Sequence, residues 1–141
     1  MVVQIGAGKL KIQEKLNIEI CRLLKSVWFE SGGIIGIDKN GLICEFQYDN
    51  PISYNCFEYR PNTEFLNKII NYDWSEKEIS FAGFVHSHPH NSIISDADIK
   101  YAQKIMKANE MKNILMGILD LSINETSIIW YNISNEKYQT Y

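Results

Sequence analysis

Two histidines and an aspartate are the residues whose types and spacing point most directly to chemistry in this sequence. His86 and His88 stand two positions apart at the end of Ser80 to His86, a short apolar segment that is typical of a buried strand. Because side chains alternate along a strand, both imidazoles point to the same side. Neutral imidazole is the commonest metal ligand in proteins, so the pair forms half of a tetrahedral site. Asp98, at the start of the next predicted helix, can supply a carboxylate as the third ligand.

Two histidines and one carboxylate leave the fourth position of a zinc ion to water, and this open position distinguishes a catalytic zinc site from a structural one. An open site indicates hydrolysis, because zinc lowers the pKa of bound water to about 7 and polarises a carbonyl. Proton transfer to a leaving amine still requires a carboxylate nearby. Glu30, followed by Ser-Gly-Gly-Ile-Ile-Gly, is the best candidate for this base, and Glu45 is a weaker rival.

Three segments together resemble the signature of the JAMM (MPN+) zinc metalloproteases. They read E-S-G-G-I-I-G at Glu30 to Gly36, G-F-V-H-S-H-P at Gly83 to Pro89, and S-D-A-D at Ser95 to Asp98. Their order, the glycines after the glutamate and the helix after the serine are similar to the family pattern, over about Leu10 to Leu121. One departure is the loop between the second histidine and the serine, which has six residues where the usual pattern has seven.

The resemblance implies a role for each residue of the signature. His86, His88 and Asp98 would hold one Zn2+, and Glu30 would be the general base. Ser95 would be the hydroxyl that steadies the water and the developing oxyanion. The implied architecture is the JAMM/MPN-like, cytidine-deaminase-like sandwich.

The same resemblance implies a substrate and partners. Small stand-alone prokaryotic members of the family are expected to cleave the isopeptide or peptide bond after the C-terminal tail of a ubiquitin-like protein, in deconjugation or precursor processing. The expected partners are therefore that ubiquitin-like protein or its conjugates, together with activating and conjugating enzymes of the same pathway. A metal-free MPN-type scaffold subunit and a general zinc peptidase acting on small peptides are the alternative functions.

Simpler interpretations of single residues stay open. Ser95 and Asp98 also form an ordinary helix start, in which a serine cap and an acidic residue satisfy free amides and the helix dipole. Asp96 is a fallback third ligand. His90 has no place in the signature and is expected to be a solvated loop residue. The tryptophans, Trp28 among them, are interpreted as core and rim packing rather than a nucleotide-stacking platform.

The strands and helices expected around these residues indicate an α+β sandwich, with a curved, mixed β-sheet flanked by helices. Strands and helices intermingle without a regular βαβ repeat, which argues against a doubly wound fold. The spacing predicts strands over Lys9 to Ile12, Gly33 to Ile37, Leu42 to Tyr48, Ser80 to His86, Asn113 to Leu121 and Ser127 to Ile133. Helices are expected over Asn17 to Phe29 with Ile18 on its apolar side, after Pro61, and over Ser95 to Asn109.

Composition bounds the remaining possibilities. A chain of 141 residues with 45% apolar composition predicts one domain over residues 1–141. Its 14 basic and 17 acidic residues lack the basic excess of a nucleic-acid binder, so neither DNA nor RNA is expected as a partner. No secretory signal and no membrane-spanning stretch is predicted, so a cytoplasmic location is expected. Cys21, Cys44 and Cys56 lack metal-binding spacing and are expected to be reduced.

Overall fold

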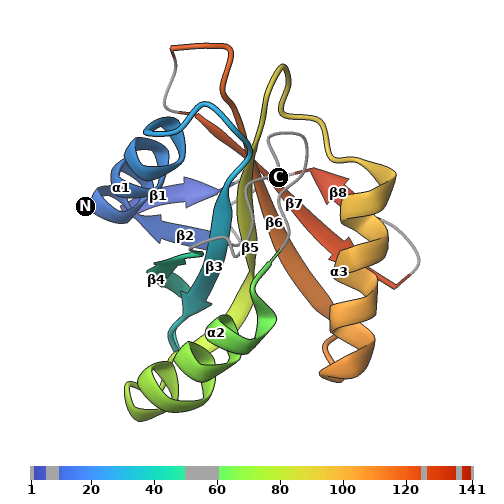
Figure 1. Ribbon diagram of the computed structural model, residues 1–141. Coiled ribbons are helices and arrows are strands. Elements are labelled where there is room, and N and C mark those ends of the chain that lie inside the picture. Colours follow the sequence, from blue (N-terminus) through green and yellow to red (C-terminus); the bar gives the residue numbers. More distant parts are fainter. Residues whose placement is uncertain (1, 6–9, 50–60, 125–126, 136–137, 141) are drawn as a thin grey trace.

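A single curled sheet forms the centre of the molecule (Figure 1). The structure is a computed structural model that describes residues 2–5, 10–49, 61–124, 127–135 and 138–140. In these ranges eight strands pair in the order β1-β2-β4-β3-β5-β6-β7-β8. They are β1 (Val2–Ile5), β2 (Leu10–Gln13), β3 (Gly32–Ile37), β4 (Leu42–Tyr48), β5 (Ser80–His88), β6 (Asn113–Asp120), β7 (Ile128–Ser134) and β8 (Tyr138–Thr140).

The sheet is mixed, because β2 and β4 run parallel, as do β5 and β6, while the other neighbours are antiparallel. The β3–β4 hairpin turns at Gly41, which adopts a φ of 84° that suits glycine. The Oδ1 atom of Asp38 accepts hydrogen bonds from the backbone N–H groups of Asn40 and Leu42. The mixed sheet and this hairpin confirm the α+β prediction.

Helices cover both faces of the sheet. On one face, α1 (Glu14–Lys25) packs its buried residues Leu16, Ile20, Cys21 and Leu24 into a core with β2 to β7. On the other face lie α2 (Thr63–Lys68), its π-helical continuation η1 (Ile69–Trp74), and α3 (Asp96–Ala108). Figure 1 shows α1 on one side of the strands and α2 and α3 on the other. The two cores are separate because the sheet divides them.

Some predicted details are wrong. The first helix begins three residues earlier and ends four residues earlier than predicted, at Glu14 and Lys25. Ile18, expected on its apolar side, is 55% exposed. The helix expected to open at Pro61 begins at Thr63, with the side chain of Asn62 as its cap. Strands β1 and β8 were not predicted.

The tryptophans and cysteines differ in their surroundings. Trp74 and Trp130 are buried, whereas Trp28 is 79% exposed and belongs to no core. Cys21 and Cys44 carry free thiols, and Cys56 lies outside the described residues. No helix in the described ranges is long and apolar enough to cross a membrane.

An irregularity in β5 decides which face its last residues occupy. The pairing of β3 with β5 shifts by one residue, so that Gly36 pairs with Phe81 although Ile35 pairs with Gly83. The extra residue, Ala82, packs in the α1 core, whereas Phe84 packs in the α3 core. Gly83 allows the close approach to β6 here, since a Cβ atom would lie 1.9 Å from the carbonyl oxygen of Leu115. Beyond this bulge, even-numbered residues of β5 face α3.

Candidate metal centre

Two imidazoles and one carboxylate converge at the end of β5. The Nε2 atom of His86 lies 3.2 Å from Oδ1 of Asp98, and Nε2 of His88 lies 3.2 Å from Oδ2 of the same carboxylate. The two imidazole ring centroids are 4.7 Å apart. One potential ligand atom from each of the three residues lies within 4.8 Å of the others, which is a spacing suited to a shared metal ion. The structure therefore brings together the three predicted ligands.

The strand fixes the two histidines. After the bulge at Ala82, the alternation along β5 directs His86 and His88 to the face that α3 covers, and the intervening Ser87 to the opposite face. His86 pairs with Ile118 and His88 with Asp120 in the parallel ladder with β6, so neighbouring strands hold the backbone on both sides of His86. His86 is 5% exposed, which restricts its rotamers.

The helix start fixes the aspartate. The hydroxyl of Ser95 accepts a hydrogen bond of 3.1 Å from the backbone N–H of Asp98, and Oδ2 of Asp98 accepts one of 3.2 Å from the backbone N–H of Ser95. This reciprocal capping box orients the carboxylate before any metal binds. The capping interpretation of Ser95 is thus confirmed, and the cap directs Asp98 toward the histidines.

The short loop before α3 still allows the residues to meet. Ile94 is 6% exposed and packs in the α3 core, which anchors the end of the loop. The hydroxyl of Tyr131 on β7 donates a 2.8 Å hydrogen bond to the carbonyl of Ser92. Within the loop, Oδ1 of Asn91 accepts a hydrogen bond from the backbone N–H of Ile93. These contacts hold a loop of six residues in a course that brings the start of α3, and with it Asp98, to the histidines.

The electrostatics of the cluster favour a carboxylate facing protonatable imidazoles. Burial alone would raise the pKa of Asp98. Hydrogen bonds from His86 and His88, the charge of His86 and the backbone N–H of Ser95 together hold this pKa well below its usual value. Burial alone would lower the pKa of His88, but the hydrogen bond and charge of Asp98, with a smaller effect of Glu30, raise it. The carboxylate of Asp98 thus favours positive charge on the side chain of His88.

Glu30 lies beside His88 because the two chain segments are joined just outside the regular ladder. Gly32 pairs with His86, and the backbone N–H of Ser87 donates a 2.9 Å hydrogen bond to the carbonyl of Ser31. Continuing this antiparallel register by one pair places Glu30 opposite His88, on the same face of the sheet. The charge of Glu30 acts on the pKa of His88, as this placement requires.

The weaker candidates lie away from the cluster. Glu45 pairs with Gly36 at the far end of β3, and its carboxylate lies 3.5 Å from Nζ of Lys77. Asp96 and His90 are both exposed, and neither belongs to the cluster of potential ligands. The geometry therefore favours Glu30 over Glu45 as a base and Asp98 over Asp96 as a ligand.

Two features of this region were missed in the sequence. Ser87 is fully buried, and its hydroxyl accepts a 3.0 Å hydrogen bond from the backbone N–H of Ser31. A polar residue between two ligands in a buried strand was the available signal. The second is the exposure of Trp28, which the sequence did not signal, because the helix was predicted to continue to Phe29 but ends at Lys25.

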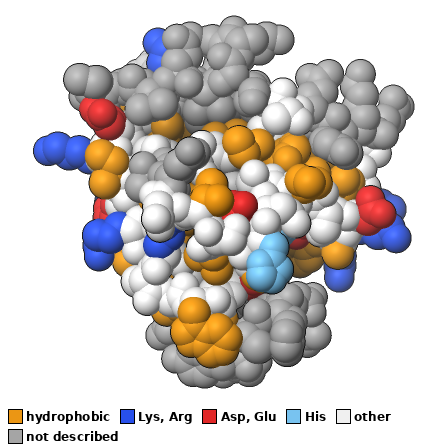
Figure 2. Space-filling view, turned by 90° about the horizontal axis from the view of Figure 1, so that it is seen from above, with side chains coloured by type: hydrophobic (Ala, Val, Ile, Leu, Met, Phe, Trp, Pro, Cys, Tyr) orange, Lys and Arg blue, Asp and Glu red, His pale blue; other side chains and the backbone are white. Residues whose placement is uncertain are grey.

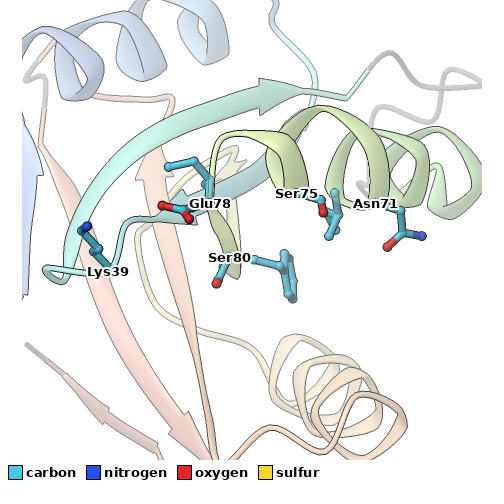
Figure 3. Close-up of a pocket in the computed structure, with 8 residues that line it drawn as sticks. Lys39, Asn71, Ser75, Glu78 and Ser80 are labelled. Carbon is cyan, nitrogen blue, oxygen red and sulfur yellow. The ribbon is translucent and has the colours of Figure 1, made fainter.

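Hollows occur at both ends of the sheet. Figure 2 looks onto the end that carries the cluster, where a histidine side chain lies at the surface among hydrophobic side chains. A hollow of about 720 Å³ lies at the other end, and Lys39, Asn71, Ser75, Glu78 and Ser80 are among the residues that line it (Figure 3). It contains neither histidine nor cysteine, and Ser80 begins the strand that His88 ends. The hollow in Figure 3 is therefore separate from the candidate metal centre.

The sequence matches no protein-family model and no curated protein, but the structure matches several solved structures. A JAB1/MPN domain protein from Archaeoglobus fulgidus, AF2198, superposes with a TM-score of 0.58 at 15% identity, over 96% of this chain and 95% of that one. The chain has the fold of a JAB1/MPN domain. Protein DSY2949 from Desulfitobacterium hafniense gives a TM-score of 0.73 at 14% identity, covering 92% of this chain and 88% of that one.

A protein from Salinibacter ruber is also similar, with a TM-score of 0.56, 12% identity and coverage of 92% and 87% of the two chains. At these identities the likeness establishes the JAB1/MPN fold and not the activity. The three converging side chains are an independent observation on this chain, and they are compatible with a metalloprotease site on that fold.

Proposed function

We propose that the protein is a zinc-dependent protease of the JAMM type, which hydrolyses the isopeptide or peptide bond after the C-terminal tail of a ubiquitin-like protein. The observation that carries the proposal is the convergence of His86, His88 and Asp98 within 4.8 Å on a JAB1/MPN fold. Two imidazoles and one carboxylate are the donor set of an open, catalytic zinc site, so the residues present fit this metal.

Each residue near the centre has a distinct task in this proposal. His86, His88 and Asp98 hold the zinc ion, which supplies a Lewis acid that acidifies water and polarises the scissile carbonyl. Glu30 takes a proton from the attacking water and delivers it to the leaving amine. The hydroxyl of Ser95 orients that water and donates to the oxyanion, and its cap orients Asp98.

The substrate class rests on the resemblance of the three motifs and on the lining of the strand end. Gly32 pairs with His86 and is buried, and it adds no side chain to the sheet face beside the centre. Tails that end in Gly-Gly suit such a narrow site because they also lack side chains. Extended segments bind by backbone hydrogen bonds that depend little on sequence.

The test compares two fusions of one ubiquitin-like protein to a reporter, joined through Gly-Gly or through Ala-Leu. The zinc-loaded protein is expected to cleave the Gly-Gly fusion faster by tenfold or more, in a reaction that a chelator abolishes and zinc restores. Equal rates on both fusions, or cleavage of short peptides alone, would favour a general zinc peptidase. A protein that retains no zinc would instead be a scaffold subunit.

A further inference from the structure

A second hollow lies at the same end of the sheet as the candidate metal centre. It has a volume of about 680 Å³ and is lined by residues 25–28 at the end of α1, residues 89–90 after β5, and Leu121, Ile123 and Asn124 after β6. Its apolar walls include Val27, Trp28 and Pro89. A space of this volume is large enough for a bulky side chain together with the backbone that carries it.

The walls of this hollow are the segments that carry the catalytic candidates. Trp28 stands two residues before Glu30, and Pro89 follows His88 directly. The segments are tied together by hydrogen bonds, because the backbone N–H of Leu121 donates to the carbonyl of His88 at 2.9 Å. The Nζ atom of Lys25 likewise donates to the carbonyl of Ile123 at 2.8 Å. The hollow thus adjoins in sequence two residues of the proposed active site, Glu30 and His88, neither of which lines it.

Trp28 is the feature that suggests a ligand. Its side chain is 79% exposed, whereas Trp74 and Trp130 are 3% and 5% exposed. The ring makes an edge-to-face contact with its neighbour Phe29 at 5.7 Å between centroids. Ile123, across the hollow, is 42% exposed. Covering such surface on binding is favourable, and aromatic side chains of this kind are frequent anchors in binding sites.

We propose that this hollow is a specificity subsite that receives a large apolar side chain of the leaving polypeptide, next to the scissile bond. The assignment of the hollow to the leaving side of the scissile bond follows from the proposed function, on which this inference rests. Glu30 must reach the leaving amine to protonate it, and the Trp28 wall lies on the Glu30 segment. A cationic side chain is disfavoured, since Lys25 is the formally charged residue among those that line the hollow.

Binding can be measured without turnover in a variant that lacks the proposed base. Trp28 provides the signal, because it is exposed while Trp74 and Trp130 are buried. The full-length Glu30→Gln protein would be titrated with the peptides Gly-Gly-Leu-Ala and Gly-Gly-Lys-Ala, and acrylamide quenching of tryptophan fluorescence recorded. The leucine peptide is expected to reduce quenching at least twofold, and the lysine peptide to leave it unchanged. Unchanged quenching with the leucine peptide would overturn the subsite, whether or not the wild-type protein cleaves any substrate.

Cleavage kinetics provide a second, separate test of the subsite. Fusions cleaved after Gly-Gly would carry leucine or lysine as the next residue, and the ratio of their kcat/KM values would be measured. Trp28→Ala is expected to lower the wild-type preference for leucine about tenfold, whereas Trp28→Phe should retain it. Tyr72→Ala is the matched control, since Tyr72 is an aromatic residue that is 69% exposed on η1, away from the hollow. Cleavage of neither fusion by the zinc-loaded wild type would contradict the proposed function, and an unaltered ratio in Trp28→Ala would contradict the subsite.

Discussion

The hydroxyl of Ser87 accepts a 3.0 Å hydrogen bond from the backbone N–H of Ser31, and the backbone N–H of Ser87 donates in return to the carbonyl of Ser31. Both residues are at most 1% exposed. Ser31 follows Glu30 and Ser87 precedes His88, so this pair of hydrogen bonds sets the proposed base beside a proposed metal ligand. The proposed chemistry depends on a contact on the opposite face of the sheet.

Ser87→Ala is therefore expected to lower kcat while the protein keeps its zinc and its KM, because the Glu30 segment loses its tie to β5. The buried N–H of Ser31 would lose its partner, which costs about 1–3 kcal/mol of stability. Ser87→Thr keeps a hydroxyl and should recover most of kcat, and the exposed Ser127→Ala is the control. Zinc content, kcat and thermal unfolding would be measured on each variant. Equal loss of kcat in the Thr and Ala variants would argue against the tie.

Glu30→Gln is expected to reduce kcat about a hundredfold or more while zinc content stays unchanged, since a general base contributes at least that factor and is not a ligand. Glu45→Gln is the matched control, because Glu45 is a half-buried carboxylate on the adjacent strand that contacts Lys77 instead. The measurement is kcat together with metal content by mass spectrometry. Loss of zinc from Glu30→Gln would make Glu30 a structural residue.

Substitution of Ser95 separates its two tasks. Ser95→Ala removes the cap and the hydroxyl, so it should cost about 1 kcal/mol of stability and lower the rate about a hundredfold or more. Ser95→Asn preserves capping, because asparagine is as good an N-cap as serine, but it lacks the hydroxyl. Near-native stability with a strongly reduced rate is expected for Ser95→Asn. A fully active Ser95→Asn protein would mean that Ser95 only caps the helix.

Zinc affinity should rise with pH through the neutral range. The raised pKa of His88 means that the metal-free protein keeps this imidazole protonated to higher pH than usual, although burial alone would favour the neutral form. The pairing with Asp98 stabilises the metal-free fold below the ordinary histidine value of 6.5 and is lost as pH rises through the raised pKa.

Zinc binding needs the neutral ring and must release this proton. Competition titrations between about pH 6 and pH 9, and calorimetry in buffers of different ionisation enthalpy, would reveal it. The exposed His90→Ala variant should behave like the wild type. A zinc affinity that is constant over this range would be inconsistent with the raised pKa.

The candidate site was predictable because its signals are local. The two-residue spacing of His86 and His88 needs only the alternation of a strand, and the spacing of Ser95 and Asp98 needs only the geometry of a helix start. Their meeting across the fold depends on the bulge at Ala82, which no pattern in the sequence marks. The placement of Glu30 was expected from its motif, but the Ser31–Ser87 hydrogen bonds that produce it join residues 56 positions apart.

The errors in the fold have a common cause, which is that pairing and packing with distant segments override local spacing. Val2–Ile5 is a strand because it pairs with Leu10–Gln13, and four residues carry too little pattern to predict this. Ile18 fits an apolar spacing as well as Ile20 does, but only Ile20 meets the sheet. Trp28 is hydrophobic, but it lies beyond the end of α1 and outside the core. Exposure of such a residue is a property of the fold and is visible only there.

The central claim is that His86, His88 and Asp98 hold one catalytic zinc ion, and elemental analysis of the purified protein tests it most directly. The protein would be prepared without chelators, beside His88→Ala and the exposed-histidine control His90→Ala, and metals would be quantified per chain. One zinc per chain is predicted for the wild type and for His90→Ala, with near zero for His88→Ala. A wild-type protein without zinc that also fails to bind added zinc, or a His88→Ala variant that keeps a full equivalent, would contradict the claim.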